Sequence, residues 1–588
     1  MRLKQTRTKD GRVWLSIVRR YREGGVSKTK TVERVGWLDE LKESFDDPVA
    51  HFSARAEALT IAEAEAAAAR AVEIHPLEKI DARGDLRKNL GFCALSAIYH
   101  ELGLDGFFKN HQRHRGFEYS VDAVVRLLVF DRVLRPSSKR GAFAAAGDYF
   151  ESFKFSLDDV YRALTHIAGL KDALLEQLNG RVATTWGRPD KFAYYDVTNY
   201  YFEIDEPDDL RRKGVSKEHR PEPIVQMGLL MDASGLPVAY DLFCGNTPDC
   251  DTLTTVLSHI RGEKRVASGF GRVVVVADRG VNTSDNVFSL LAKGDGYVFA
   301  KSVRGASAEL QRWVRSEAGY SPGLDRDGAA FRSKSRIAER TLTVTVAAAT
   351  DDSPKKTKRT KVTEKQVAFW SAKYAARARS ERAEAVARAR AMVASPPKLK
   401  ALIDHTAAKY VLGVTVDENG EAAEVDSVLL FDSERLAREE ELDGYYVIST
   451  SETQMTAAEI IESYRELWRI EESFRVTKSD LCYRPIYLSD PDHIKAHFAI
   501  CFIALLICRI LQVETGWRHS VATIAETLSR ASGTHLSENW WVFDHRDGAI
   551  DEIGAALGID FRRKYLTSGE IRSIVASTKK PRAARTSL

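Results

Sequence analysis

The sequence is poor in cysteine. Only six cysteines occur among 588 residues, and no two of them form a C-x-x-C pair. So few cysteines in so long a chain argue against a disulfide framework, and the missing pairs leave no zinc-binding pattern. The cysteine content therefore indicates a reducing compartment, and we expect a cytoplasmic protein.

A long hydrophobic run and a large net charge are also missing. The charged N-terminus, Met1 to Arg7, has no apolar signal-peptide core. The most apolar stretch, Ala499 to Val513, is shorter than the ~20 residues that cross a bilayer, so we expect a buried core helix and no membrane. The net charge is only +4, from 87 Lys and Arg against 83 Asp and Glu, which does not indicate nucleic acid by itself.

The N-terminal third combines strand and helix patterns with basic clusters. Alternation over residues 12–38 around Gly24-Gly25 predicts a β-hairpin with a basic surface. The Ala- and Glu-rich residues 47–74 predict a long exposed helix that serves as a connector. From about 80 to 187 the pattern is helical, with basic clusters in the breaks. Two interpretations remain open here: a helix-turn-helix-like DNA-binding module, or a helical bundle with a charged rim.

From about residue 190 the pattern changes to strands. A continuous apolar run, Val273 to Ala277, is typical of a strand buried on both faces. Strands followed by alternating strands and helices predict a mixed α/β sheet. Residues 302–440 interrupt this pattern with β-like pieces and a basic stretch, in which Lys355 to Arg390 holds twelve Lys or Arg against three Glu. That stretch is either a solvated helix or a surface facing nucleic acid.

These changes of pattern divide the chain into seven segments within an α/β multidomain protein. We expect an N-terminal β-hairpin region, a helical connector, a helical DNA-binding domain, the first part of a catalytic core, a β-rich insertion domain, the second part of the core, and a C-terminal region with a basic tail. Their respective ranges are 1–45, 46–78, 79–188, 189–301, 302–440, 441–520 and 521–588.

Two aspartates stand out by their position in strands. Asp196 lies inside an aromatic, β-branched strand, where an ionised carboxylate is costly unless a cation pairs with it. That cation is either a bound metal or a buried Lys or Arg. Asp278 ends the run Val273 to Ala277, and ligand sites of α/β sheets gather at strand ends. An Asp in that position also serves often as a helix cap or turn residue.

A third acid, Glu471, lies on a helix predicted for 457–477. One face of this helix carries aromatic, aliphatic and charged side chains, namely Tyr464, Leu467, Trp468, Glu471, Phe474, Arg475 and Lys478. An acid that holds metal beside cations that hold phosphate oxygens suits phosphodiester chemistry. For Trp468, core packing and stacking on a base are both open.

The segment Tyr464-Arg-Glu-Leu-Trp-Arg-Ile-Glu-Glu-Ser-Phe-Arg-Val-Thr-Lys478 resembles the Tyr–Arg–Glu–Lys signature of the DDE transposases of bacterial insertion sequences. Tyr464, Glu471 and Lys478 have the spacing of that signature, whereas Leu467 stands where the family has Arg. Asp196 and Asp278 lie in segments that resemble the first-Asp and second-Asp strands of the family, and the insert resembles that of its branch with a β-rich insertion domain.

The resemblance implies a ribonuclease-H-like catalytic domain interrupted by the β-rich insertion. It implies that Asp196, Asp278 and Glu471 are catalytic and hold two Mg²⁺ ions, with Mn²⁺ as a substitute. It also implies double-stranded DNA as partner, namely terminal inverted repeats and target DNA, and a homodimer on that DNA. The DNA-contacting candidates are Tyr464, Arg465, Trp468, Arg469, Arg475 and Lys478.

The function implied is DNA transposition: hydrolysis at transposon ends, then transfer of the freed 3′-hydroxyl into target DNA. One alternative is a ribonuclease-H-like nuclease without strand transfer. Another is a non-catalytic DNA-binding protein derived from a transposase. A third is that the acids are structural and the insert is a separate binding module.

Overall fold

The computed structural model describes the 588 residues apart from 9, 24–25, 67–85, 190, 205, 215–221, 348–355, 396–404, 417–421, 485, 538, 581 and 583–588. The chain divides into two compact units, Met1–Gly84 and Asp85–Leu588. Gly24 and Gly25, much of the connector predicted for 46–78 and the end of the basic tail lie outside the described residues.

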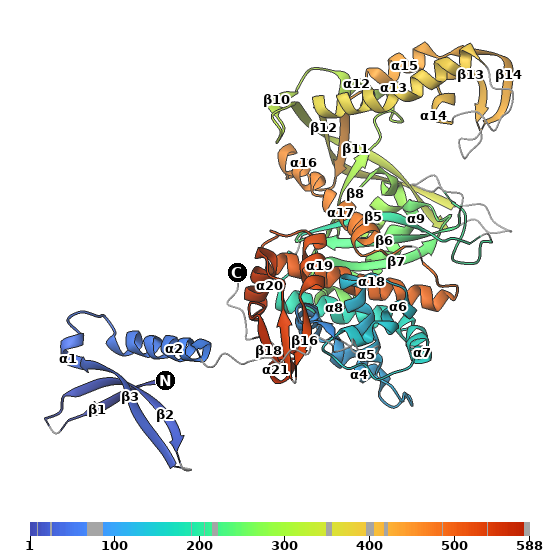
Figure 1. Cartoon of the computed structure of the whole chain (residues 1–588). Coiled ribbons are helices and arrows are strands. Elements are labelled where there is room, and N and C mark those ends of the chain that lie inside the picture. Colours follow the sequence, from blue (N-terminus) through green and yellow to red (C-terminus); the bar gives the residue numbers. More distant parts are fainter. Residues whose placement is uncertain are drawn as a thin grey trace. The chain divides into compact units, whose positions relative to one another are not determined.

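The first unit is a three-stranded antiparallel sheet with two helices (Figure 1). The predicted hairpin is present as β2 and β3, but a further strand, β1, pairs with β2. The helix α2 was expected to be an exposed connector, and this is wrong in part: it packs on β1, and its Phe52 and Ala56 are buried. The elements are β1 (Arg2–Arg7), β2 (Val13–Glu23), β3 (Val26–Trp37), α1 (Leu38–Leu41) and α2 (Pro48–Ala66).

A nine-stranded sheet forms the centre of the second unit, in the order β10-β11-β12-β15-β9-β8-β5-β6-β7. Strands β5, β6 and β7 form an antiparallel meander, and β8 and β9 run parallel to β5. The predicted strands are present here, and β8 is buried throughout. The bounds are β5 (Phe192–Tyr201), β6 (Ile224–Asp232), β7 (Pro237–Cys244), β8 (Val274–Ala277), β9 (Gly296–Lys301) and β15 (Tyr445–Thr450), with helices α9 (Asp249–Leu257), α10 (Lys264–Ala267) and α11 (Ser284–Ala292) and the 3-10 turns η2 (Ser258–Ile260) and η3 (Arg279–Val281).

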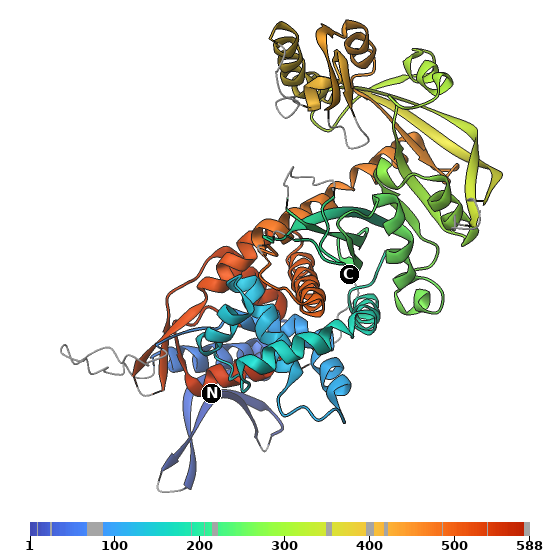
Figure 2. The same cartoon turned by 90° about the vertical axis from the view of Figure 1, so that its right-hand side faces the viewer.

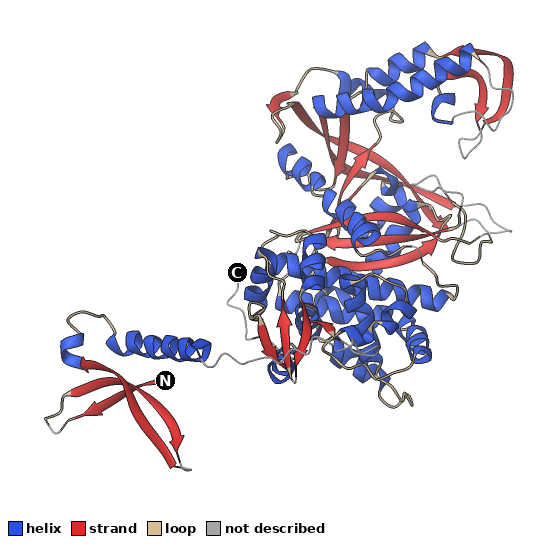
Figure 3. Cartoon of the chain, in the orientation of Figure 1, coloured by secondary structure: helices blue, strands red, loops and turns tan. Residues whose placement is uncertain are grey.

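The boundary predicted for the insertion, 302–440, does not match the sheet. Its long strands β11 and β12 pair with each other, and β12 pairs with β15, so they extend the central sheet rather than form a separate domain (Figure 3). The later part, around α13 and β14, has a core of its own, which includes Ala389, Met392 and Tyr410, and a small separate cluster around α12 includes Leu310 and Val314. The bounds are α12 (Ala308–Arg315), β10 (Ser321–Leu324), β11 (Ala330–Ala347), β12 (Lys356–Ser371), α13 (Ala372–Ala394), α14 (His405–Ala408), β13 (Val411–Val416), β14 (Ala422–Phe431) and α15 (Ser433–Glu440).

The helical segment and the C-terminal segment, predicted as separate regions, share one core. The strand β4 pairs with β16 in a four-stranded sheet, and α19 and α20 pack on α3. The bounds are β4 (Arg87–Asn89), α3 (Phe92–Glu101), α4 (Leu104–Gln112), α5 (Val121–Leu134), α6 (Lys139–Ala144), η1 (Ala146–Asp148), α7 (Leu157–Ala168), α8 (Lys171–Thr185), α19 (Val521–Arg530), β16 (Ser532–Ser537), β17 (Trp540–Phe543), α20 (Gly548–Leu557), β18 (Tyr565–Thr567) and α21 (Ser568–Ser577).

The apolar helix α18 (Pro491–Glu514) lies at the centre of this core, against α3, α5, α7 and β7 (Figure 2). It is longer than the apolar stretch predicted from the sequence, and among the described residues it alone is long and apolar enough to cross a membrane. However, 94% of its most apolar window is buried inside the protein. Burial, rather than shortness, therefore identifies α18 as a core helix.

Candidate active site

The two predicted aspartates lie side by side on neighbouring parallel strands. Tyr195 of β5 is paired with Ala277 of β8, and Asp196 and Asp278 are the next residue on each strand. Side chains alternate between the faces of a strand, so Asp196 shares the face of Tyr194. The charges of Glu466 and Arg469 act on Tyr194, whose pKa rises to about 12, chiefly through burial. Asp196 therefore faces the helices that carry the predicted third acid.

The helix predicted for 457–477 is broken into three pieces. Helix α16 (Ala457–Arg465) ends at Glu466, α17 (Trp468–Arg475) begins after Leu467, and a π-helical turn, η5 (Val476–Asp480), follows. Helix α17 contacts β5, and π-helical turns are frequent at functional sites. The break separates Tyr464 from Glu471, and the π-turn carries Lys478.

Tyr464 links the second aspartate to the third acid. Its hydroxyl donates a hydrogen bond to Asp278 Oδ1, at 3.2 Å. Burial raises the pKa of Tyr464, and the negative charges of Asp278 and Glu471 raise it further. The structure therefore places these three groups within electrostatic reach of one another.

Glu471 and its neighbour Glu472 have different surroundings. Glu472 forms ion pairs with Arg509 and Arg475, as expected for a structural acid. Glu471 is exposed, and no ion pair or hydrogen bond of its carboxylate occurs within the described part of the chain. Asp278 is exposed as well, and the hydroxyl of Tyr464 is its side-chain partner. Both acids are thus placed to accept a cation.

The three predicted carboxylates do not form a complete metal-binding site in this structure. Among the described residues, no group of three or more His, Cys, Asp or Glu side chains is close enough to hold one metal ion. What the structure brings together is therefore the pair of aspartates on neighbouring strands, with Tyr464 hydrogen-bonded to Asp278, while a three-carboxylate cage is not formed among the described residues.

The predicted DNA-contacting side chains differ in how strongly the protein holds them. Trp468 is 51% exposed, so the core-packing alternative is wrong for it. Arg469 is tied to Glu466, at 2.6 Å, and to the carbonyl of Ala233, whereas the guanidinium of Arg465 lies over the ring of Phe331.

Further along the same helical face, after Glu471, two positions carry cationic side chains. Arg475 pairs with Glu472 and Asp480 at more than 3 Å, and Lys478 lies over the ring of Tyr200. Leu467, at the signature Arg position, is buried at 7% exposure. Of the two arginines near this position, Arg469 is held by Glu466 and the carbonyl of Ala233, whereas Arg465 lies over the ring of Phe331.

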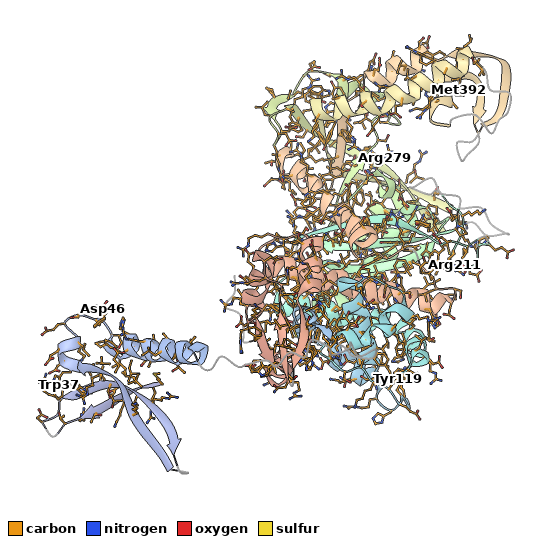
Figure 4. The ribbon with its side chains drawn as sticks, in the orientation of Figure 1. Trp37, Asp46, Tyr119, Arg211, Arg279 and Met392 are labelled. Carbon is orange, nitrogen blue, oxygen red and sulfur yellow. The ribbon has the colours of Figure 1, made fainter. Side chains whose placement is uncertain are left out.

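The sequence did not indicate two side chains near the site, the aromatic Trp517 and the cationic Arg279. Trp517 is 42% exposed and lies beside Arg469, which is also close to Trp468. It comes from the loop after α18, so no spacing in the sequence connects it with α17. Arg279, labelled in Figure 4, directly follows Asp278 and is exposed. The sequence signal for Arg279 was its position directly after Asp278, the acid at the end of β8.

Two family models match parts of the chain. A model of the transposase DDE domain matches residues 202–507, more than half of the chain, so the chain belongs to the transposases with a DDE domain. A model of the N-terminal domain of IS1634 family transposases matches residues 1–70. The chain is therefore a DDE transposase of a bacterial insertion sequence: a DNA-binding enzyme that cleaves DNA and transfers strands, using divalent metal ions.

The DDE match includes Asp278 and Glu471 but begins after Asp196. Among solved structures, a cryo-EM structure of the piggyBac transposase synaptic complex with hairpin DNA aligns with a TM-score of 0.30 and 8% identity, over 90% of this chain and 82% of that chain. No curated protein gives a significant match.

Proposed function

We propose that Asp196, Asp278 and Glu471 are the catalytic acids of this transposase, in a ribonuclease-H-like core. The observation that carries the proposal is the pair of aspartates one residue beyond the Tyr195–Ala277 pairing of two parallel strands. The strand order β7-β6-β5-β8-β9, an antiparallel meander followed by two parallel strands, supports the ribonuclease-H-like core. Asp196 rests on this geometry alone, since the DDE match begins at residue 202.

The acids suit a magnesium site by their chemistry. Mg²⁺ takes oxygen ligands, keeps several waters and needs few carboxylates. The exposed carboxylates of Asp278 and Glu471 have no cationic partner among the described residues. We propose two Mg²⁺ ions, with Mn²⁺ as a substitute: Asp196 shared between them, and Asp278 and Glu471 holding one each. Held by these acids, two such ions would supply an activated attacking oxygen and stabilise the leaving oxygen.

We infer that the site is completed when DNA binds. The described residues contain no preformed three-ligand cluster, while the break at Glu466 and Leu467 separates α17 from α16. We expect α17 to move on DNA binding so that Glu471 approaches the aspartates. The hydroxyl of Tyr464 orients Asp278, and Arg465, Trp468, Arg475 and Lys478 line the path of the DNA, with Arg469 held beside Trp468.

The DNA substrates we propose are the terminal inverted repeats and a target duplex in the bacterial cytoplasm, bound by a homodimer. The test is Mg²⁺-dependent cleavage of end DNA by wild type and by Asp278→Asn. Loss of the cation-binding charge at a catalytic acid is expected to lower the cleavage rate by at least about a thousandfold, with DNA affinity retained.

The matched control is Asp158→Asn, which removes an exposed acid in the first turn of α7 and is expected to cleave like wild type. Equal cleavage by Asp278→Asn and wild type contradicts the assignment of the site. Products joined to a plasmid target separate a transposase from a nuclease that only cuts, and a wild type that binds end DNA but never cleaves it is a non-catalytic derivative.

A further inference from the structure

A basic cavity occurs whose lining includes none of the three acids. It has a volume of about 470 Å³, within the range of ligand pockets. Its walls come from the start of α6, from the chain after η5 and from α18, and none of its described lining residues is acidic. The side chains that matter below are Arg132, Lys139, Tyr161, Arg484, Tyr487 and His497.

Lys139 is a buried cation without a counter-charge. It is 5% exposed, and its Nζ donates to Nδ1 of His497 at 3.0 Å, a neutral partner whose other nitrogen bonds to a carbonyl. Within the described part of the chain no carboxylate pairs with Lys139. The nearby Asp131 is occupied by Ser137 and Arg135. Burial, with the positive charge of Arg132, lowers the pKa of Lys139 to about 7.

Arg132 adds a second buried positive charge. It is 6% exposed and donates to the carbonyl oxygens of Cys482, at 2.8 Å, and Ser137, at 2.9 Å, while its Nε has no partner among the described residues. Two cations that share a buried site and bind only neutral groups are costly. An anion in the cavity offsets that cost.

The cavity lies at the end of the strand that carries Asp196. Arg484, on its wall, lies over the ring of Tyr201, the last residue of β5, and Lys478 lies over the preceding Tyr200. Tyr201 lies five residue steps beyond Asp196 along the strand, which is ~16 Å at 3.3 Å per step. That length equals about five steps of a DNA strand at 3.4 Å each. Tyr487, 73% exposed, stands at the rim of the cavity.

We propose that this cavity receives a backbone phosphate of the transposon-end DNA, bound by Lys139, Arg132 and Arg484 some five nucleotides from the bond that is cut. The inference rests on the DNA-binding function and deepens the proposed active site, because it places the path of the DNA along β5. The bound phosphate supplies the negative charge that no described carboxylate provides to Lys139.

The main test is Lys139→Met, which keeps the length of the side chain and removes its charge. End-DNA affinity, measured in EDTA between about 50 and 200 mM KCl, is expected to fall about tenfold, and the slope of log K against log[salt] to decrease by about 0.9, the value of one phosphate contact. The melting temperature without DNA is expected to stay or rise, since Met removes an uncompensated buried charge. Lys109→Met, at an exposed lysine paired with Asp105, is the control that changes neither.

A second variant, Arg484→Met, acts at the wall of the cavity and keeps the test valid if Lys139→Met does not fold. Inorganic phosphate is the small probe: it is expected to raise the melting temperature of wild type but not of either variant. Unchanged DNA affinity and salt slope in the variants overturn the proposal, and so does a lowered melting temperature of Lys139→Met with normal DNA binding. A phosphate effect without a change in salt slope also overturns it, in favour of a free-phosphate site. Because EDTA removes the metal, failure here is separate from failure of Asp278→Asn.

Discussion

At the scale of single residues, the hydroxyl of Tyr464 is the group that joins the acids. It donates to Asp278 at 3.2 Å, and its pKa responds to the charges of both Asp278 and Glu471. A hydroxyl that bonds to one carboxylate oxygen leaves the other oxygen available to a cation. We therefore propose that Tyr464 orients Asp278, in place of the direct DNA contact expected for it from the sequence.

Tyr464→Phe tests this role, because it removes only the hydroxyl. A hydrogen bond to a charged group contributes about 1.5–3 kcal/mol, so the cleavage rate at saturating DNA is expected to fall about 10- to 100-fold. The Mg²⁺ concentration for half-maximal rate is expected to rise, while DNA affinity stays the same. Cleavage kinetics over a Mg²⁺ titration give both values.

The control for this variant is Tyr446→Phe. Tyr446 is partly exposed and close enough to Asp278 for the charge of that acid to act on its pKa. Its ring stacks on Phe369, so the substitution keeps the packing. A Tyr464→Phe enzyme that behaves like Tyr446→Phe at every Mg²⁺ concentration removes Tyr464 from the site.

Residue spacing predicted part of this site and missed the rest for a physical reason. Tyr464, Glu471 and Lys478 follow one another on one stretch of chain, so their spacing is readable. Trp517 and Lys139 reach their positions only through tertiary packing, which no local pattern encodes. Leu467 looked like a defect in the signature, and in the structure it is a buried core residue.

At the scale of elements, a buried carboxylate joins the strands β9, β11 and β12. Glu364 is fully buried; Lys301 lies 3.2 Å and Arg340 3.6 Å from its oxygens, and the hydroxyl of Tyr297 donates to it. Burial alone would raise the pKa of Glu364, but Lys301, Gln366 and Arg340 together lower it below the usual 4.5. This network fastens the extension β11–β12 to the parallel strands that carry the site.

Glu364→Ala is expected to destabilise the protein by about 2–4 kcal/mol, since it removes a buried carboxylate and leaves two partly buried cations without their counter-charge. Chemical denaturation measures this loss. Because the pKa is lowered by folding, the stabilisation is present above about pH 4.5 and is lost as the pH falls through the lowered value. The difference between wild type and variant is therefore expected to shrink in acid.

Glu339→Ala provides the matched control. It removes a glutamate of β11 whose partner, Lys361, is as exposed as itself, and exposed pairs contribute only about 0–1 kcal/mol. Equal losses for the two variants contradict the view that the buried network fastens the extension.

At this scale, the local sequence pattern predicted most strands and helices but not which strands pair with one another. The apolar run before Asp278 is β8, and the strands expected from about residue 190 onward are present as β5, β6 and β7. The pairing of β12 with β15 was missed because its partners lie far apart in the sequence. The break after α16 and the π-turn were missed because an apolar periodicity continues through both.

At the scale of the whole molecule, the chain consists of two units with separate cores. In the first, Leu15, Ile17, Phe52 and Ala56 are buried, and this unit coincides with the match to the IS1634 N-terminal domain. Its strand β1 exposes Arg2, Lys4 and Arg7. A small basic unit with its own core is suited to add phosphate contacts to those of the catalytic unit.

A truncated chain that begins at residue 85 tests whether the first unit adds DNA contacts that catalysis itself does not require. Since the second unit keeps its entire core, its melting temperature is expected to lie within a few degrees of the main transition of the full chain. Its affinity for end DNA is expected to fall at least tenfold, and the salt slope to decrease by about 0.9 for every phosphate that the first unit neutralises. Cleavage at saturating DNA is expected to persist, because all three acids and Lys139 lie beyond residue 85. A truncated chain that melts far below the full one contradicts the separate cores, whereas one with the full affinity and salt slope shows that the first unit does not contact the DNA.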